Sequence, residues 1–191
     1  MSSFSNKVFL RKKLLSERKA YSPQRRVRES LAMFRRFVQY GFWHSGDRVH
    51  LFSSISTLGE PDTYPLFILF WSLGCPTFSS YLDEKQNMIS IRCLARTSFH
   101  IGNMGIPVPK HYLAVQDSVE FDLILVPLLG FNAQGHRIGY GKGYYDKFLS
   151  QHSESLRIGL CLHPHIIPFR AHHDDIPLHL VITPQKTHHF I

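Results

Sequence analysis

The sequence predicts a single α/β domain, residues 1–191, built on a mostly parallel sheet with helices on both faces and preceded by two basic N-terminal helices. From residue 48 onward, short apolar runs alternate with helical patterns, as in parallel sheets whose strands are joined by helices. The run FDLILVPLL at 121–129 is apolar at nearly every position, as expected of a strand covered on both faces. The length and a hydrophobic content of 43% suit one domain with its own core.

The two N-terminal helices are predicted from their start and stop signals. The first covers about residues 6–19, where aliphatic residues lie among cations. Ser22 and Pro23 then provide an N-cap and a proline at the first position of the second helix. Apolar residues recur at steps of four, three and four along that helix: Val27, Leu31, Phe34 and Val38. Gly41 ends it.

The remaining elements are predicted from short apolar runs between turn residues. Strands are expected at 49–53, 77–82, 88–94, 121–129, 156–162 and 178–183. Helices are expected at 63–73 and 142–151. Residues 102–110 contain two glycines and two prolines, so we expect a surface loop there.

Composition argues against a membrane or secreted protein. The longest mostly apolar stretch, 64–74, has 11 residues, whereas a membrane span needs about 20. The N-terminus has no apolar stretch followed by a small-residue cleavage site. The three cysteines, Cys75, Cys93 and Cys161, lie far apart in the sequence and suit reduced, packed thiols. We therefore expect a cytoplasmic protein without a membrane partner.

The net charge of +8 is concentrated in the first quarter of the chain. Residues 1–48 hold 12 of the 22 Lys and Arg but three of the 14 acidic residues, a balance of +9, and the remainder carries −1. Such asymmetry indicates a polyanionic partner. Composition leaves open whether that partner is a nucleic acid, a membrane surface, or a phosphorylated or carboxylate-rich small molecule.

The strongest motif is a glycine-rich segment, GFNAQGHRIGYGKGYYDKFL at 130–149, between a buried strand and a helix. Open parallel sheets bind ligands at this position. Three glycines would let backbone N–H groups approach an anion closely: Gly139, Gly141 and Gly143. Arg137 and Lys142 add charge, the helix start adds a positive dipole end, and Asp146 could hold Mg²⁺ bound to phosphates. The motif therefore predicts a nucleotide-phosphate site, with a simple strand-to-helix turn as the alternative.

Two common nucleotide motifs do not fit this segment. A P-loop needs Ser or Thr after the lysine, but Gly143 follows Lys142. The dinucleotide fingerprint needs a glycine where Tyr144 stands.

The segment 127–149 resembles the signature of the 5-formyltetrahydrofolate cyclo-ligases. Three further blocks are similar to family segments in the same order: NKVFLR at 6–11, GEPDT at 59–63 and DIPLHLVITP at 175–184. Asn132 stands where the family usually has Asp, in a turn where either residue caps well. The resemblance covers nearly the whole chain.

The resemblance implies an enzyme that uses ATP and Mg²⁺ to convert 5-formyltetrahydrofolate to 5,10-methenyltetrahydrofolate, releasing ADP and phosphate. The formyl oxygen is phosphorylated, N10 attacks the formyl carbon, and phosphate leaves. Such chemistry chiefly needs positioning and charge neutralisation. The implied partners are therefore ATP and a folate, with or without a polyglutamate tail, and neither a nucleic acid nor a membrane.

The resemblance also implies roles for particular residues. ATP contacts are implied for Lys7, Arg11, Arg137, Gly139, Gly141, Lys142, Gly143, Tyr144 and Tyr145. Catalytic roles are implied for Arg137, Lys142 and Lys7. Folate contacts are implied for Ile55, Glu60, Tyr140 and Tyr144. Metal ligation is implied for Asp146 and, as a second carboxylate, Asp175.

Each of these roles has a structural alternative. Lys7 and Arg11 share a helical face through their i, i+4 spacing, but that face could simply be solvated. Asp146 could complement the helix dipole. The remaining alternatives are a turn role for Asp175, a helix-entry role for Glu60, and core packing for Tyr144 and Phe131, which could otherwise flank a ligand ring.

Eight of the 13 histidines follow residue 150, and we expect them to lie in loops and in the C-terminal tail. No Cys or Glu accompanies them at zinc-ligand spacing, and we expect the rings of neighbouring histidines to diverge. A nucleic-acid-binding protein would use the two basic helices, but no recognisable motif supports it. A second rival hypothesis is a catalytically inactive member of the family that binds folate or nucleotide without turnover. The retained motif residues argue against it.

Overall fold

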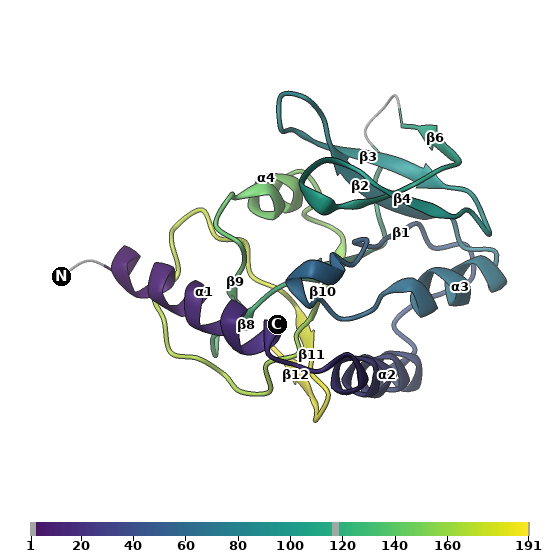
Figure 1. Ribbon diagram of the computed structural model, residues 1–191. Helices are drawn as coiled ribbons and strands as arrows, with labels where there is room; N and C mark the ends of the chain where they lie inside the picture. Colours follow the sequence, from purple (N-terminus) through teal and green to yellow (C-terminus); the bar gives the residue numbers. More distant parts are fainter. Residues whose placement is uncertain (1–2, 116–118, 191) are drawn as a thin grey trace.

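The computed structural model describes residues 3–115 and 119–190, and in these ranges an eight-stranded sheet forms the centre of the fold (Figure 1). The strand order is β12-β11-β10-β7-β1-β2-β3-β6. Five strands run parallel: β1 (Val49–His50), β2 (Thr77–Leu82), β7 (Leu123–Pro127), β10 (Leu156–Leu160) and β11 (Leu180–Ile182). Antiparallel strands lie at the two ends: β3 (Met88–Cys93), β6 (Tyr112–Ala114) and β12 (Thr187–His189). The mostly parallel sheet is therefore confirmed.

Helices cover both faces of this sheet, as predicted. On one face, α2 (Pro23–Tyr40) and α3 (Tyr64–Ser72) pack against the odd-numbered residues of β7. On the other face, α4 (Tyr144–Ser150) packs against its even-numbered residues. The side chains of β7 therefore alternate between two cores, which explains why the whole run is apolar.

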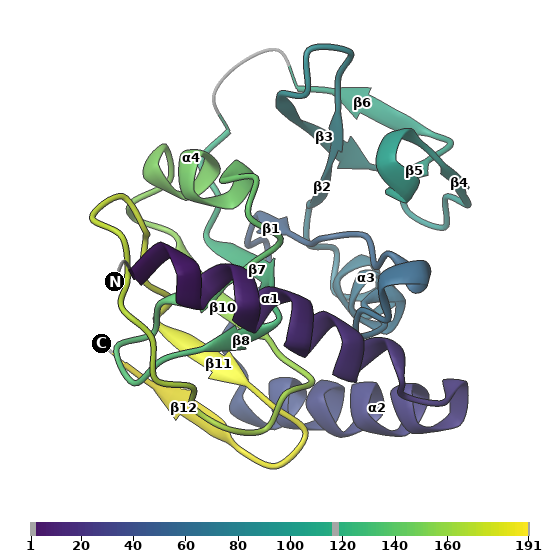
Figure 2. The ribbon, with the colours of Figure 1, turned by 60° about the vertical axis from the view of Figure 1, so that its left-hand side comes forward.

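The N-terminal helix α1 (Ser3–Lys19) lies against the segment that follows the carboxyl end of β7 (Figure 2). That segment forms a small hairpin of β8 (Gly130–Phe131) and β9 (Arg137–Ile138). Leu14 of α1 is buried in a cluster with Leu129 and Ile138. This contact brings the cations of the first quarter to the edge of the sheet where ligands are expected.

Local signals predicted the start of α2 and both ends of β2 to the residue. The Ser22 hydroxyl accepts a hydrogen bond from the N–H of Arg25 at 3.1 Å, and Gly41 closes the helix with φ +60°. The predicted strand at 49–53 is shorter in the structure, because β1 is paired as a strand only at Val49–His50. Leu51 still donates its N–H to Phe78 O at 2.8 Å.

Two predictions about irregular segments were wrong. Residues 102–110 are not simply a loop, because a 3₁₀ turn, η2 (Asn103–Gly105), leads into β5 (Pro107–Pro109), which pairs with β4 (Phe99–Ile101). Prolines are compatible with such a two-stranded edge, where some N–H groups need no strand partner. The C-terminal histidines are not all loop decoration, because β12 pairs with β11 and buries His188.

The cysteines are packed, as expected. All three cysteines are buried, and burial raises the pKa of the Cys93 and Cys161 thiols to about 12. Across the two described ranges, no helix is long and apolar enough to cross a bilayer.

His50 makes the stability of this fold depend on pH. Its ring is fully buried in β1, and its Nε2 lies 2.7 Å from the Ser80 hydroxyl. Burial, followed by the charge on His152, lowers the pKa of His50 to about 3. In the unfolded chain this histidine is protonated below about pH 6.5, whereas in the folded chain it stays neutral until the pH is near 3. The free energy of unfolding is therefore highest at neutral pH and falls as the pH is lowered from 6.5 towards 3.

We therefore predict that His50 alone lowers the free energy of unfolding by about 2 kcal/mol between neutral pH and pH 5. His50→Phe should make the free energy of unfolding depend less steeply on pH in this range, because about one proton fewer is taken up on unfolding. Denaturant unfolding at several pH values measures this slope. The exposed His111→Phe is the control and should keep the wild-type slope. Equal slopes for wild type and His50→Phe would contradict the prediction.

Candidate active site

Two adjoining cavities lie where the glycine-rich segment leaves the carboxyl end of β7. The larger, about 750 Å³, is called here the cationic cavity, and the smaller, about 260 Å³, the apolar cavity. Five residues line both: Pro127, Tyr140, Lys142, Tyr144 and Tyr145. The glycine-rich segment therefore forms the wall between them.

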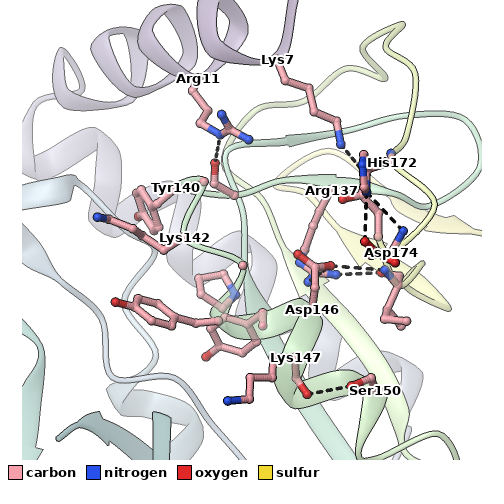
Figure 3. Close-up of a pocket in the computed structure, with 18 of the residues that line it drawn as sticks. Lys7, Arg11, Arg137, Tyr140, Lys142, Asp146, Lys147, Ser150, His172 and Asp174 are labelled. Atoms are coloured by element: carbon pink, nitrogen blue, oxygen red, sulfur yellow. Dashed lines mark hydrogen bonds and ion pairs between the residues drawn. The ribbon is translucent and has the colours of Figure 1, made fainter. Parts of the chain in front are cut away.

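The cationic cavity collects charges from four parts of the chain (Figure 3). Its cations are Lys7, Arg11, Arg137, Lys142 and Lys147. Its carboxylates are Asp146, Asp174 and Asp175. With five cations against three carboxylates, the cavity suits an anionic ligand.

Helix α1 supplies two of these cations. Lys7 forms an ion pair with Asp175, and both side chains are largely buried. Its Nζ also lies 5.4 Å from the centre of the Phe169 ring. Arg11 donates from Nε to Gly139 O at 3.0 Å. Lys7 and Arg11 thus face the glycine-rich segment and do not form a solvated helix face.

Arg137 and Asp146 form a second ion pair in this cavity. Arg137 is 7% exposed and donates to Asp146 Oδ1 at 2.6 Å and to Ile176 O at 2.7 Å. The N–H of Ile176 donates to the same Asp146 oxygen at 3.2 Å. Burial lowers the pKa of Arg137, and the charges of Asp146 and Asp175 oppose that shift. These bonds join the glycine-rich segment, α4 and the loop before β11.

Asp175 is held by two donors. Its Oδ2 accepts from Lys7 and from the N–H of His172, the latter at 2.7 Å. Partial burial acts to raise the pKa of Asp175, but the hydrogen bonds from Lys7 and His172 and the nearby Arg137 outweigh it, so the pKa is lowered. Both predicted metal-ligand carboxylates therefore line one cavity, and the shift favours the ionised form of Asp175.

The donor set of this cavity fits Mg²⁺. Mg²⁺ prefers oxygen ligands and is commonly held by one or two carboxylates together with substrate phosphates. Asp146 and Asp175 are such carboxylates, and each is paired with a cation. Because the cavity carries more cations than carboxylates, it fits a divalent ion that arrives with polyphosphate better than a bare ion.

One histidine prediction needs correction. The rings of His172 and His173 do not diverge, because their centres are 4.2 Å apart. With Asp174 they offer ligand atoms that all lie within 4.8 Å of one another. The sequence spacing had not predicted this group, since the loop conformation brings the three side chains together at the rim of the cationic cavity.

The apolar cavity contains one buried acid. Glu60 is 3% exposed; its Oε2 accepts from the N–H of Ile55 at 2.7 Å and its Oε1 from the Tyr140 hydroxyl. Ile55 and Tyr144 also line this cavity, and the Tyr144 hydroxyl donates to Gln86 at 3.0 Å. The 14 residues singled out from the sequence thus all line one cavity or both. Phe131, by contrast, is fully buried in the core and contributes nothing to either.

Sequence reasoning missed Arg18. This residue of α1 is buried and donates to the Tyr140 hydroxyl, to Leu58 O at 2.9 Å and to Leu128 O at 3.3 Å. A signal was available, because Arg18 follows Arg11 by seven residues and therefore lies on the same face of the helix.

Several arginines of α2 have structural partners. Arg26 donates to Ser56 O at 3.1 Å, and Arg36 donates to Pro184 O at 3.2 Å. Arg25 and Arg28 both lie beside Glu29. Nothing in the structure explains Arg35.

Comparison with known proteins identifies the family of this chain. A sequence profile of the 5-formyltetrahydrofolate cyclo-ligase family matches residues 3–184. The chain belongs to this family. The family consists of ligases, so the chain is an enzyme of that class.

Relatives and solved structures agree with the cyclo-ligase assignment. The chain is 30% identical to the 5-formyltetrahydrofolate cyclo-ligase of Mus musculus over 161 residues, which cover 78% of each chain. It is 29% identical to that of Escherichia coli K12 over 136 residues, 67% of this chain and 74% of the other. The NMR structure of Aquifex aeolicus 5,10-methenyltetrahydrofolate synthetase superposes with a TM-score of 0.76 at 26% identity, covering 96% of this chain and 92% of the other.

Two glycines of this cyclo-ligase give a matched test of the loop. Gly141 has φ +90°, and a Cβ there would lie 2.9 Å from Cζ of Arg11. Gly139 has ordinary φ and open space around it. We predict that Gly141→Ala lowers the free energy of unfolding by about 1–2 kcal/mol, whereas Gly139→Ala leaves it unchanged or slightly higher. Denaturant unfolding measures both, and equal losses would contradict the prediction.

Proposed function

We propose that this enzyme converts 5-formyltetrahydrofolate and ATP to 5,10-methenyltetrahydrofolate, ADP and phosphate, with Mg²⁺ as the metal. One observation carries the proposal: a cationic cavity and an apolar cavity share a wall that contains Lys142. A phosphoryl transfer between two substrates requires their reacting groups to meet, and two cavities with a common wall allow that meeting.

ATP is proposed to bind in the cationic cavity. Lys7, Arg11 and Arg137 neutralise its phosphates, and the backbone N–H groups of 139–143 add donors without side-chain obstruction at Gly139 and Gly143. Because Lys7 is paired with Asp175, phosphate binding must loosen or share that ion pair. Tyr144 and Tyr145 supply ring surface beside the phosphates.

The carboxylates of Asp146 and Asp175 would hold Mg²⁺ beside the phosphates. When bound there, the ion neutralises charge on the phosphate oxygens. Arg137 orients Asp146 through its 2.6 Å bond, and His172 orients Asp175 through its N–H. The chain's own contribution is thus to orient two carboxylates towards the ion.

The folate ring is proposed to bind in the apolar cavity. Each carboxylate oxygen can accept a second hydrogen bond, so Glu60 can accept from the N–H donors along one edge of the pterin. Ile55 and Tyr144 offer apolar contact, and Tyr140 closes the side towards the phosphates. An apolar cavity with one precisely held acceptor is typical of a small-molecule site.

Lys142 is the cation common to both cavities. In the proposed reaction the formyl oxygen attacks the γ-phosphate, and ADP departs. N10 then attacks the formyl carbon, the C–O bond breaks, and phosphate leaves with the oxygen while N10 loses its proton. Lys142, with Arg137, would neutralise the charge that develops on the transferred group.

The direct test uses the purified chain with Mg²⁺, ATP and 5-formyltetrahydrofolate. We predict the appearance of the near-ultraviolet absorbance of the methenyl product together with equimolar ADP. Omission of any one component should abolish the signal. A folded protein that gives no absorbance change at saturating substrates would refute the proposed function.

Lys142→Met is predicted to lower kcat by about 100-fold, the size expected for removing a charge that stabilises a phosphoryl-transfer transition state. Because Lys142 is exposed, the thermal unfolding midpoint of the variant should equal that of the wild type within error. Lys110→Met, at an exposed lysine outside both cavities, is the control and should keep full activity. A Lys142→Met enzyme with wild-type kcat would exclude the role given to this lysine.

A further inference from the structure

Arg18 is the third basic residue on the inner face of α1, and it differs from the other two. Lys7 and Arg11 line the cationic cavity, whereas Arg18 lines neither cavity and is only 5% exposed. Its guanidinium joins three segments through Leu58 O, Leu128 O and the Tyr140 hydroxyl. A buried cation is costly unless its hydrogen bonds are satisfied, and here three of its nitrogens have acceptors.

The hydrogen bonds of the chain Arg18–Tyr140–Glu60 run in one direction, from the guanidinium to the carboxylate. A guanidinium has donors only, so the Tyr140 oxygen must accept from Arg18. The single proton of the hydroxyl is then free to point to Glu60 Oε1. The other oxygen, Oε2, accepts from the N–H of Ile55. Both carboxylate oxygens therefore receive donors, which is the pattern of an ionised glutamate.

The surroundings of Glu60 make this arrangement necessary. Burial raises the pKa of Glu60, and the Ile55 N–H, the Tyr140 hydroxyl and the Arg18 charge work against that rise. The titratable or charged groups facing it are Arg18 from α1, Tyr140 and Lys142 from the glycine-rich segment, and Tyr145 from α4. Of the two cations, Arg18 is the one that hydrogen bonds link to Glu60, through the Tyr140 hydroxyl.

We infer that Arg18 is a positioning residue for the apolar cavity: through the Tyr140 hydroxyl it holds Glu60 as an ionised, correctly turned acceptor for the N–H edge of the substrate ring. The inference rests on the proposed function only for the identity of that substrate. The basic residues on the inner face of α1 then have two roles. Lys7 and Arg11 contact the phosphates, and Arg18 positions the group that binds the second substrate.

The experiment compares Arg18→Met and Arg18→Lys with Lys19→Met, the exposed neighbour, as control. The first readout is the Kd of 5-formyltetrahydrofolate without ATP, by calorimetry between pH 6 and 8.5. Arg18→Met should weaken binding by about 10-fold at pH 7.5, the loss of one charge-supported hydrogen bond. The deficit should grow as the pH falls, because without Arg18 the carboxylate of Glu60 is protonated at higher pH. The KM for ATP should change less than about twofold, a shift below 0.5 kcal/mol, and Arg18→Lys should recover part of the loss.

A second variant tests the path through Tyr140. Tyr140→Phe removes the hydroxyl that links Arg18 to Glu60. In that background Arg18→Met should cost much less folate affinity than it costs in the wild type, because the two changes break the same chain. If Arg18→Met does not fold, the pH profiles of Arg18→Lys and Tyr140→Phe provide the same comparison.

Other outcomes would overturn the inference. Arg18 variants that lose thermal stability but keep the wild-type folate Kd and its pH dependence would make Arg18 a purely structural residue. Equal losses for ATP and folate, or additive effects with Tyr140→Phe, would do the same. A wild-type chain that binds no 5-formyltetrahydrofolate would refute the proposed function instead, so the two failures are distinguishable.

Discussion

The packing of α1 against the hairpin that follows β7 is the contact on which the rest of the site depends. Leu14 is buried with Leu129 and Ile138, and this small apolar cluster lies apart from the two cores that hold the sheet to its helices. The charged residues of α1 are positioned from this anchor. Lys7 and Arg11 lie on its N-terminal side, towards the cationic cavity, and Arg18 lies on its C-terminal side, where it contacts Tyr140.

The electrostatics of the site follow from the same arrangement. Bringing five cations to one cavity is unfavourable unless carboxylates are interleaved, and Asp146 and Asp175 provide that compensation through ion pairs with Arg137 and Lys7. Two of the five cations are thus paired with carboxylates inside the site. When a polyphosphate binds together with a divalent ion, the paired cations can contact the phosphates and the paired carboxylates can contact the ion. No buried charge is then left without a partner.

The elements best predicted from sequence are those with local causes. The helix at 23–40 begins at a serine cap and ends at a glycine, and both signals act within a few residues. The short pairs β8–β9 and β4–β5 and the terminal strand β12 exist because a partner lies beside them, and no local pattern reports that partner. The candidate site was predictable because its residues occupy a few specific motifs. Arg18 was missed because its role arises from contacts with segments distant in sequence, and the His172–His173 group was missed because it depends on the conformation of one loop.

The ion pair between Lys7 and Asp175 joins residues 168 positions apart. A ribosome adds about 5–20 residues per second, so Lys7 waits on the order of 10 s for its partner to be synthesised. A nascent chain that has already paired β1 with β2 still lacks the acidic side of its cationic cavity. The cationic cavity therefore cannot bind its ligand in the proposed manner until the segment around Asp175 has been synthesised and has closed the contact with the first helix.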